Sequence, residues 1–419
     1  MTIAHDSSRR QELLMSPGAV RREPELHRAP AAFRTALSIL ARNWSAGDLT
    51  FVMPSGREVR FQGEAPGPSA RLLVRDPRFM NRVLAAGDIG FAEAYMDGQW
   101  DTPDMAALLG AFSQNFDKIG RLALGAPVMW VINRLYHLFH DNSRAGARKN
   151  IHAHYDLGNA FYGAWLDPSM TYSSALFEAE GQILQDAQTN KYRRLAEQMD
   201  LRPEHHVLEI GCGWGGFAEF AAREVGARVT AITISAEQHD FARRRLFEQG
   251  LAERAEVRLC DYRDVSGPYD RVASIEMFEA VGEKYWPAYF GKVHGVMKDG
   301  GRAALQIITI RDEYFDDYRK RADFIQRYVF PGGMLISEER LMRETDQAGL
   351  DWTGVTRFGR HYADTLAIWS QRFEAAWDEI EPLGFDERFR RLWRFYLGYC
   401  EAGFRTERTS VIQLGLSKS

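Results

Sequence analysis

The segment from His205 onward alternates between short apolar runs and stretches with helical spacing. The runs are HVLEIG, RVTAITIS, AEVRLCDY, YDRVASIEMF and RAALQIITI, and a helix candidate follows the first, second and fourth of them. Such alternation of strands and helices indicates a parallel sheet. The sequence therefore predicts an α/β, Rossmann-like fold, with SVIQLGLS near the C-terminus as a last edge strand.

A glycine-rich turn follows the first of these strands in VLEIGCGWGGFAEF. Gly211, Gly213 and Gly216 fit the spacing G-x-G-x-x-G, which lets a backbone approach a nucleotide cofactor at a helix N-terminus. A dinucleotide site also needs an acidic residue where the second strand ends, whereas Ser235 follows that strand here as a predicted N-cap, with Gln238 as its capping-box partner. The missing acidic residue at this strand end argues against a dinucleotide cofactor. S-adenosylmethionine is the alternative cofactor for such a glycine turn.

Length and composition limit the class of protein. The 419 residues suggest two or three domains, and 45% hydrophobic with 26% charged residues is typical of globular chains. A net charge of −4 argues against nucleic acid as a partner. The N-terminus lacks the apolar core of a secretory signal, and the three cysteines have no metal-ligand spacing, so we expect a cytoplasmic protein without a metal.

Four segments are expected along the chain. They are a mobile lead-in (1–30), an N-terminal α+β module (31–120), a linking amphipathic helix (121–150) and the domain with the glycine turn (151–419). In the linking helix, Val128, Ile132, Leu135 and Phe139 recur at helical spacing and a basic cluster follows. This stripe either packs on the protein core, as most such stripes do, or binds peripherally to the inner face of an anionic membrane.

Seven motifs, the glycine turn among them, carry a resemblance. HYDLGNAFYGAWLDPSMTYSSALF, VLEIGCGWGG, ITISAEQ, CDYRD, MFEAVG, FPGG and FYLGYCEAGFR occur in this order from His154 to Arg405. The chain resembles the cyclopropane-fatty-acid and mycolic-acid cyclopropane synthases, and AEAYMDGQWD resembles their N-terminal module. The resemblance implies a class I methyltransferase sheet, S-adenosylmethionine as the cofactor and unsaturated phospholipid acyl chains as substrate. The sequence leaves the oligomeric state open, a homodimer included.

The resemblance also implies the residues around the cofactor. Tyr172 and Ser173 would contact its methionine end, and Gly211, Cys212 and Gly213 would line its back. Thr233 and Gln238 would surround the ribose, and Tyr262 and Arg263 the adenine. Cys212 and Tyr262 are also well explained as residues that pack in the core.

Members of this family hold a bicarbonate ion as the base, in a site of five positions. Glu279, Ile308 and Tyr362 match three of them, whereas Ser174 replaces a cysteine and Gln306 replaces a histidine. Serine and glutamine can both donate hydrogen bonds to an anion, but the thiol and the imidazole are gone. Cys400 matches a cysteine suspected of catalysis in the family, although its helical apolar setting favours an inert thiol.

An isolated alkene is a weak nucleophile, so its methylation needs a strong electrophile and passes through a carbocation, which aromatic faces stabilise. Aromatic candidates in or beside the motifs are Tyr155, Tyr172, Phe278, Tyr328 and Tyr362. Loss of a methyl proton then gives a cyclopropane or, after a hydride shift, a methylene branch that a second enzyme can reduce to a methyl branch. Methylation of a soluble small molecule and non-catalytic lipid binding are kept as alternatives.

Overall fold

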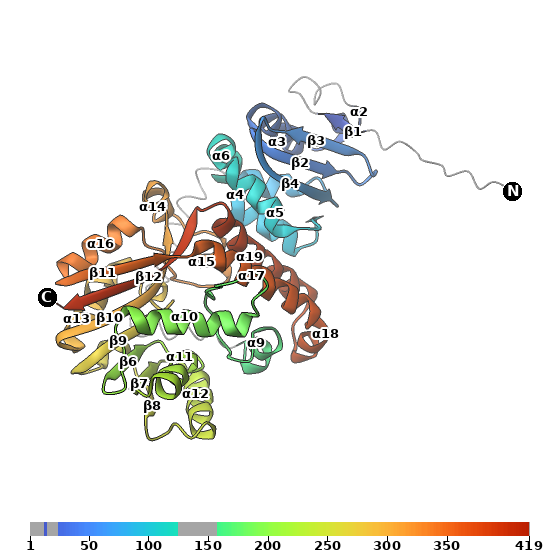
Figure 1. Cartoon of the computed structure of the whole chain (residues 1–419). Coiled ribbons are helices and arrows are strands. Elements are labelled where there is room, and N and C mark those ends of the chain that lie inside the picture. The colour runs from blue at the N-terminus through green and yellow to red at the C-terminus, as the bar shows by residue number, and fades with distance from the viewer. Residues whose placement is uncertain (1–11, 15–23, 125–156, 419) are drawn as a thin grey trace. The chain divides into compact units, whose positions relative to one another are not determined.

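A seven-stranded sheet forms the centre of the part of the chain that contains the glycine turn. The computed structural model describes residues 12–14, 24–124 and 157–418. The sheet has the order β11-β12-β10-β9-β6-β7-β8, in which neighbours from β10 to β8 are parallel (Figure 1). Its strands are β6 (His206–Ile210), β7 (Arg228–Thr233), β8 (Ala255–Leu259), β9 (Tyr269–Ile275), β10 (Met297–Ile310), β11 (Leu350–Arg357) and β12 (Thr409–Lys418). The predicted α/β fold is confirmed.

Helices cover both faces of this sheet. Residues of α10 (Leu184–Gln198), α11 (Gly216–Phe220) and α12 (Ala236–Glu248) form a core on one face, and those of α13 (Trp286–Val296) and α16 (Glu338–Gln347) form a core on the other. The strands contribute alternately to the two: on β6, Val207 packs in the first core and Leu208 in the second. Alternation arises because successive side chains of a strand point to opposite faces.

The last strand differs from its predicted position at the edge of the sheet. β12 pairs with both β10 and β11, antiparallel in each case. It therefore lies between them, and β11 is the edge strand. Residues Val411 to Leu416 of β12 are all buried, whereas most of β11 is at least partly exposed. Because β11 lacks a clear apolar alternation, its sequence, LDWTGVTR, gives a weak strand signal.

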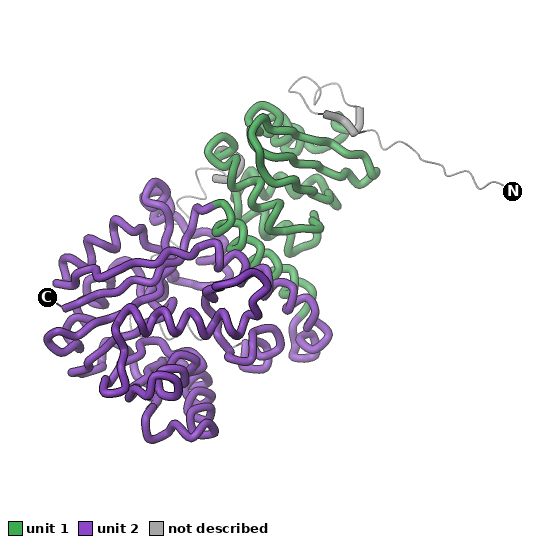
Figure 2. The backbone as a smooth tube through the Cα atoms, in the orientation of Figure 1, with its two compact units in different colours: residues 1–132, 386–406 green, residues 133–385, 407–419 purple. Residues whose placement is uncertain are grey.

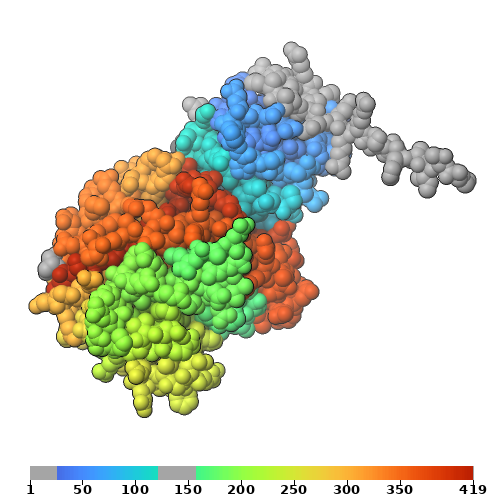
Figure 3. Space-filling model, in the orientation of Figure 1, coloured from blue at the N-terminus to red at the C-terminus, as the bar shows by residue number. Residues whose placement is uncertain are grey.

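The remaining helices of this part lie between the strands or at their ends. They are α9 (Asn159–Trp165), α14 (Asp312–Tyr318), α15 (Phe324–Tyr328), α17 (Gly359–Ala375) and α18 (Trp377–Ile380), and the 3₁₀ turns include Tyr262–Asp264 and Phe278–Ala280. α9 packs against α17, although some 200 residues separate them in sequence. In Figure 3 the green surface of the segment that contains α9 meets the orange-red surface of the later helices.

The chain forms two compact units, coloured in Figure 2, of which the first comprises Met1–Ile132 and Asp386–Thr406. Its sheet has the order β1-β3-β2-β4-β5. The strands are β1 (Glu12–Leu14), β2 (Ala46–Val52), β3 (Glu58–Gln62), β4 (Ala65–Val74) and β5 (Trp100–Asp101), and the helices are α2 (Pro24–Arg28), α3 (Ala31–Asn43), α4 (Phe79–Met96), α5 (Met105–Gln114), α6 (Phe116–Leu124) and α19 (Glu387–Arg405). The predicted lead-in, 1–30, thus contributes a strand, paired with β3, and a helix.

Helix α19 departs from the expectation of one continuous domain from 151 to 419. It approaches α5 closely: a Cβ built on Gly398 would lie 2.5 Å from Cγ of Met105. Arg391 donates hydrogen bonds to the carbonyl oxygens of Tyr95 (2.5 Å) and Trp100 (2.8 Å). The chain therefore leaves unit 2 at Phe385, adds α19 to unit 1 and returns as β12.

The linking helix predicted at 121–150 lies mostly outside the described residues, as do Tyr155 and the apolar stripe from Val128 to Phe139. Among the residues that the structure describes, no helix has the length and apolar character needed to span a bilayer.

Candidate active site

The predicted cofactor residues lie where parallel strands end. Gly211 to Gly213 follow β6, Thr233 ends β7, and Tyr262 with Arg263 form the 3₁₀ turn after β8. The carboxyl ends of neighbouring parallel strands lie at one edge of the sheet, where α/β proteins bind their ligands. The fold thus brings residues of three separate motifs, VLEIGCGWGG, ITISAEQ and CDYRD, to the same edge of the sheet.

The glycine turn needs glycine at two positions for different reasons. The φ angles of Gly211 (82°) and Gly213 (52°) are positive, which side chains disfavour. A Cβ on Gly211 would lie 2.5 Å from Cγ of Met277, whereas a Cβ on Gly213 would meet no atom within 4 Å. Gly211 therefore allows the turn to pack, and Gly213 faces open space of the kind that a cofactor fills.

The ends of β7 and β8 position the other cofactor residues. The Ser235 side chain caps α12 by accepting a hydrogen bond from the Gln238 backbone N–H, as predicted, and Thr233 Oγ1 donates to Gln238 Oε1 at 3.0 Å. The Asp261 carboxylate accepts bonds from Nε (2.9 Å) and Nη2 (2.7 Å) of Arg263. Burial raises the pKa of Tyr262 to about 12, so its hydroxyl remains protonated.

Tyr172 and Ser173 lie in two different surroundings. The Tyr172 ring contacts those of Tyr162 and Trp369, with centroids 5.3 Å away in both pairs. Ser173 Oγ accepts a hydrogen bond from the buried Lys191 Nζ at 2.6 Å. Burial lowers the pKa of Lys191 to about 7. Sequence reasoning missed Lys191, although it occupies an apolar position in the i, i+3, i+4, i+7 pattern of α10.

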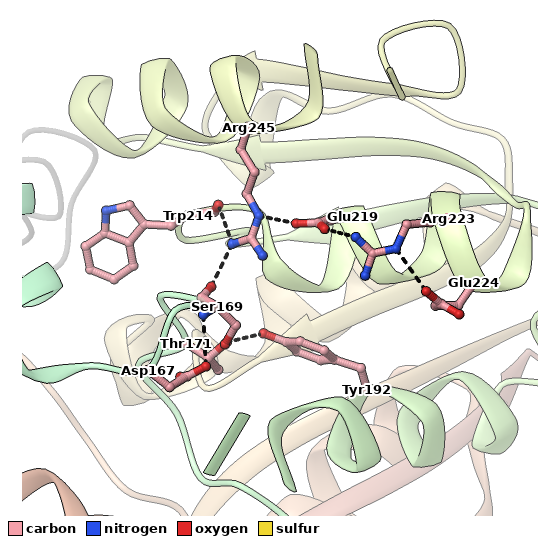
Figure 4. A network of polar contacts seen from close by, with 9 residues as sticks. All are labelled: Asp167, Ser169, Thr171, Tyr192, Trp214, Glu219, Arg223, Glu224 and Arg245. Carbon is pink, nitrogen blue, oxygen red and sulfur yellow. Dashed lines mark hydrogen bonds and ion pairs between the residues drawn. The ribbon is translucent and has the colours of Figure 1, made fainter. Parts of the chain in front are cut away.

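A second group that sequence reasoning missed is the polar network of Figure 4. Arg245 on α12 donates to the carbonyl oxygens of Ser169 (2.6 Å) and Trp214 (3.4 Å) and forms an ion pair with Glu219 on α11. Trp214 belongs to the glycine turn, and Ser169 lies in the segment that leads to Tyr172. One guanidinium therefore ties the two cofactor segments together.

Three residues of the predicted base site converge on one carboxylate. Glu276 accepts hydrogen bonds from the Ser174 backbone N–H (2.9 Å), Gln306 Nε2 (2.7 Å) and the Tyr362 hydroxyl (2.7 Å). Ser174, Gln306 and Tyr362 are buried, and burial raises the pKa of Glu276. Sequence reasoning missed Glu276, although an acidic residue directly after a parallel strand is a recognisable signal.

The other two residues of the predicted base site form a pair of their own. Glu279 Oε1 accepts a hydrogen bond from the Ile308 backbone N–H at 2.5 Å. Glu279 Oε2 is shielded from solvent and has no hydrogen-bond partner in the structure. Burial, and then the negative charge of Glu276, raise the pKa of Glu279 to about 8. A carboxylate with a free lone pair and such a pKa is suited to accept a proton near neutral pH.

The remaining candidates pack against other side chains or, in the case of Cys400, belong to the other compact unit. Cys212 packs in the core below the glycine turn, where burial raises the pKa of its thiol well above the usual range. Cys400 lies on α19, which is part of unit 1, whereas the residues discussed above belong to unit 2. Phe278 is a core residue, with its ring stacked on Trp286. Tyr328 packs against Phe324 on α15.

Comparison with known proteins shows which family the chain belongs to. The family model described as mycolic acid cyclopropane synthetase matches residues 142–414. The tuberculostearic acid methyltransferase UfaA1 of Mycobacterium tuberculosis is 36% identical over 406 residues, covering 94% of this chain and 93% of that protein. The cyclopropane-fatty-acyl-phospholipid synthase of Escherichia coli K12 is 35% identical over 376 residues, covering 86% and 90%. The crystal structure of mycolic acid cyclopropane synthase CmaA1, complexed with SAH and CTAB, gives a TM-score of 0.61 at 29% identity and covers 65% of this chain and 98% of that one.

The sheet, the glycine turn and these matches define an S-adenosylmethionine-dependent methyltransferase. The chain belongs to the mycolic acid cyclopropane synthetase family.

Proposed function

We propose that this enzyme alkylates the double bond of an unsaturated phospholipid acyl chain and closes a cyclopropane ring. The observation that carries the proposal is Glu279, a shielded carboxyl group with one unpartnered oxygen, beside strands whose ends carry the cofactor residues. Ordinary methyl transfer to a nitrogen or oxygen needs no base for a methyl proton, whereas ring closure does. The name of the Escherichia coli relative supports the same substrate class.

The residues of this chain would act around the cofactor as follows. When bound, S-adenosylmethionine supplies an electrophilic methyl group on a sulfonium. Gly213 leaves space for the cofactor to approach the backbone closely. The hydrogen bond between Thr233 and Gln238 holds the neighbouring strand end in place. The rings of Tyr172 and Trp369 offer aromatic faces to a positive charge, an attraction worth about 2 kcal/mol when water is excluded. Glu279 then accepts the proton that the added methyl group loses.

A methylene branch on the same acyl chain is the second candidate product. Two observations favour it: Ser174 and Gln306 stand where the family has a cysteine and a histidine, and the Mycobacterium tuberculosis relative is a tuberculostearic acid methyltransferase. A hydride shift before proton loss would lead to this product with the same base. The two products therefore differ in the order of steps and share the site.

Proton NMR of lipids decides between the two products. The chain is expressed in cells that contain unsaturated phospholipids but no cyclopropane or branched lipids. We expect upfield cyclopropane signals, whereas downfield vinylidene signals would establish the methylene branch. Lipids that carry neither signal, from cells with folded protein, would contradict the proposed function. Mass alone does not suffice, because both products retain the same number of methyl hydrogens.

The rate should depend on pH through the deprotonation of Glu279. Because the base must be ionised and its pKa is about 8, we expect product formation to rise about fivefold between pH 7 and pH 8 and to level off above pH 9. Single-turnover assays at saturating S-adenosylmethionine measure this.

Stability must be followed in the same buffers. Burial also raises the pKa of Glu209, a buried residue of β6, to about 8. The raised pKa values of Glu279 and Glu209 stabilise the fold at low pH, and this contribution is lost as the pH rises through 8. Thermal unfolding at each pH measures the loss of stability, so that it can be distinguished from a change in the catalytic rate. A flat profile from pH 6 to pH 9 with the fold intact would exclude Glu279 as the base.

We also propose that the protein binds membranes peripherally through the stripe from Val128 to Phe139 and the basic residues after it, a segment outside the described residues. Each Lys or Arg near an anionic surface contributes about 1 kcal/mol. In a flotation assay, most of the protein should therefore float with anionic vesicles at low salt, and much less of it should float with them at high salt. Equal recovery with neutral and anionic vesicles would contradict this proposal.

A further inference from the structure

The hydrogen-bond donors of the predicted base site already have an acceptor within the chain. Ser174 N, Gln306 Nε2 and the Tyr362 hydroxyl all donate to the Glu276 carboxylate, at 2.7–2.9 Å. They come from three separate parts of unit 2, namely the segment before α10, strand β10 and helix α17. The resemblance to the family implies that these same positions hold bicarbonate.

The fold fixes both partners of this arrangement. Glu276 has a φ of 48°, which turns the chain sharply after β9, and its backbone N–H donates to the Gln306 carbonyl oxygen at 2.9 Å. The Gln306 amide is oriented in turn, because its Oε1 accepts a bond from Gln413 Nε2 at 3.1 Å. The NH₂ group of Gln306 therefore points to Glu276. The left-handed backbone of Glu276 is a conformational strain that the site retains.

A second anion does not fit these residues. Three of the five family positions donate to Glu276, and the fourth donor, the Ile308 N–H, is used by Glu279. A bicarbonate ion would have to displace these bonds and lie beside two carboxyl groups, and like charges at short distance disfavour each other. The donor set is complete as it stands.

Resting on the proposed function, we propose that Glu276 is the built-in anion of the base site, so that Glu279 removes the proton directly and no bicarbonate takes part. A C–H bond of the added methyl group breaks, and its electron pair forms the new bond to the cationic carbon. The proton goes to Glu279 Oε2, which ends neutral as the substrate loses its positive charge. Glu276 acts as a positioning residue that holds Tyr362 and Gln306 and keeps a negative charge near the cation.

Two substitutions of Glu276 test this in different ways. Glu276→Gly removes the carboxylate and suits the positive φ, so it frees the three donors for an external anion. Glu276→Gln keeps the shape and fills the same space without the charge. Glu407→Gly is the matched control, since Glu407 is exposed and has a φ of 57°.

Transfer of labelled methyl from S-adenosylmethionine to lipid product is measured in carbonate-free buffer with and without added bicarbonate. For the wild type, and likewise for Glu407→Gly, the methyl-transfer activity should differ less than twofold between the two buffers. The methyl-transfer activity of Glu276→Gly should fall at least tenfold in buffer without bicarbonate and recover when bicarbonate is added. The activity of Glu276→Gln should be low in both buffers. Calorimetry with S-adenosylmethionine confirms that each variant retains its cofactor site.

Three results would overturn the inference. They are wild-type activity that falls several-fold without bicarbonate, Glu276→Gly that retains wild-type activity without it, and Glu276→Gly that binds S-adenosylmethionine normally yet gains nothing from bicarbonate. If Glu276→Gly does not fold, the wild type alone still decides through its response to bicarbonate. A wild type that labels no lipid in either buffer would instead refute the proposed function, and the inference with it.

Discussion

Replacing Glu279 with glutamine is expected to lower product formation by about 10²–10⁴-fold, the usual contribution of a positioned general base. The amide retains an oxygen that can accept the Ile308 N–H, so the local fold should persist. What disappears is the ionisable oxygen, which is shielded and unpartnered in the structure. The rate is measured by single-turnover labelling of lipid, and affinity for S-adenosylmethionine by calorimetry.

The affinity should remain within a few-fold of the wild type, because Glu279 belongs to the base site and not to the glycine turn. Glu204→Gln serves as the matched control, since Glu204 is exposed in the turn before β6. If Glu279→Gln forms the same product in the same amount, Glu279 is not the base and the proposed constellation is wrong.

Replacing Gly213 with valine is expected to weaken S-adenosylmethionine binding more than about 100-fold, which corresponds to about 2.7 kcal/mol. The side chain would enter the open space beside the turn, where a Cβ meets no protein atom within 4 Å. It would also have to adopt a φ of 52°, which costs roughly 1–3 kcal/mol of stability. Calorimetry measures the affinity and thermal unfolding the stability.

Gly250→Val separates these two effects. Gly250 has a φ of 69°, a Cβ there also meets nothing within 4 Å, and it follows α12 in a turn outside the proposed site. Both variants should therefore lose similar stability, and only Gly213→Val should lose the cofactor. Normal binding by Gly213→Val would mean that the space beside the turn belongs to something other than the cofactor.

The sequence by itself determined the parallel sheet and the cofactor edge. The strands from β6 to β10 are apolar runs, Gly211 and Gly213 are needed for a turn, and Ser235 caps α12 three residues before Gln238. Each of these signals depends on residues close together in the chain, so propensity, capping and spacing are enough to predict them. Individual positions of the base site could be found by resemblance for the same reason, because each lies in a short motif.

Only the tertiary structure decided how these pieces meet. β11 is the edge strand because β12 pairs with both β10 and β11. α19 packs in unit 1, where Gly398 approaches Met105, nearly 300 positions away in sequence. Likewise, Glu276 receives bonds from partners 102, 30 and 86 residues away. No local pattern encodes which acceptor such donors will share. Long-range packing therefore brings Glu276 to the three donors, where we propose that its carboxylate takes the place of a bound ion.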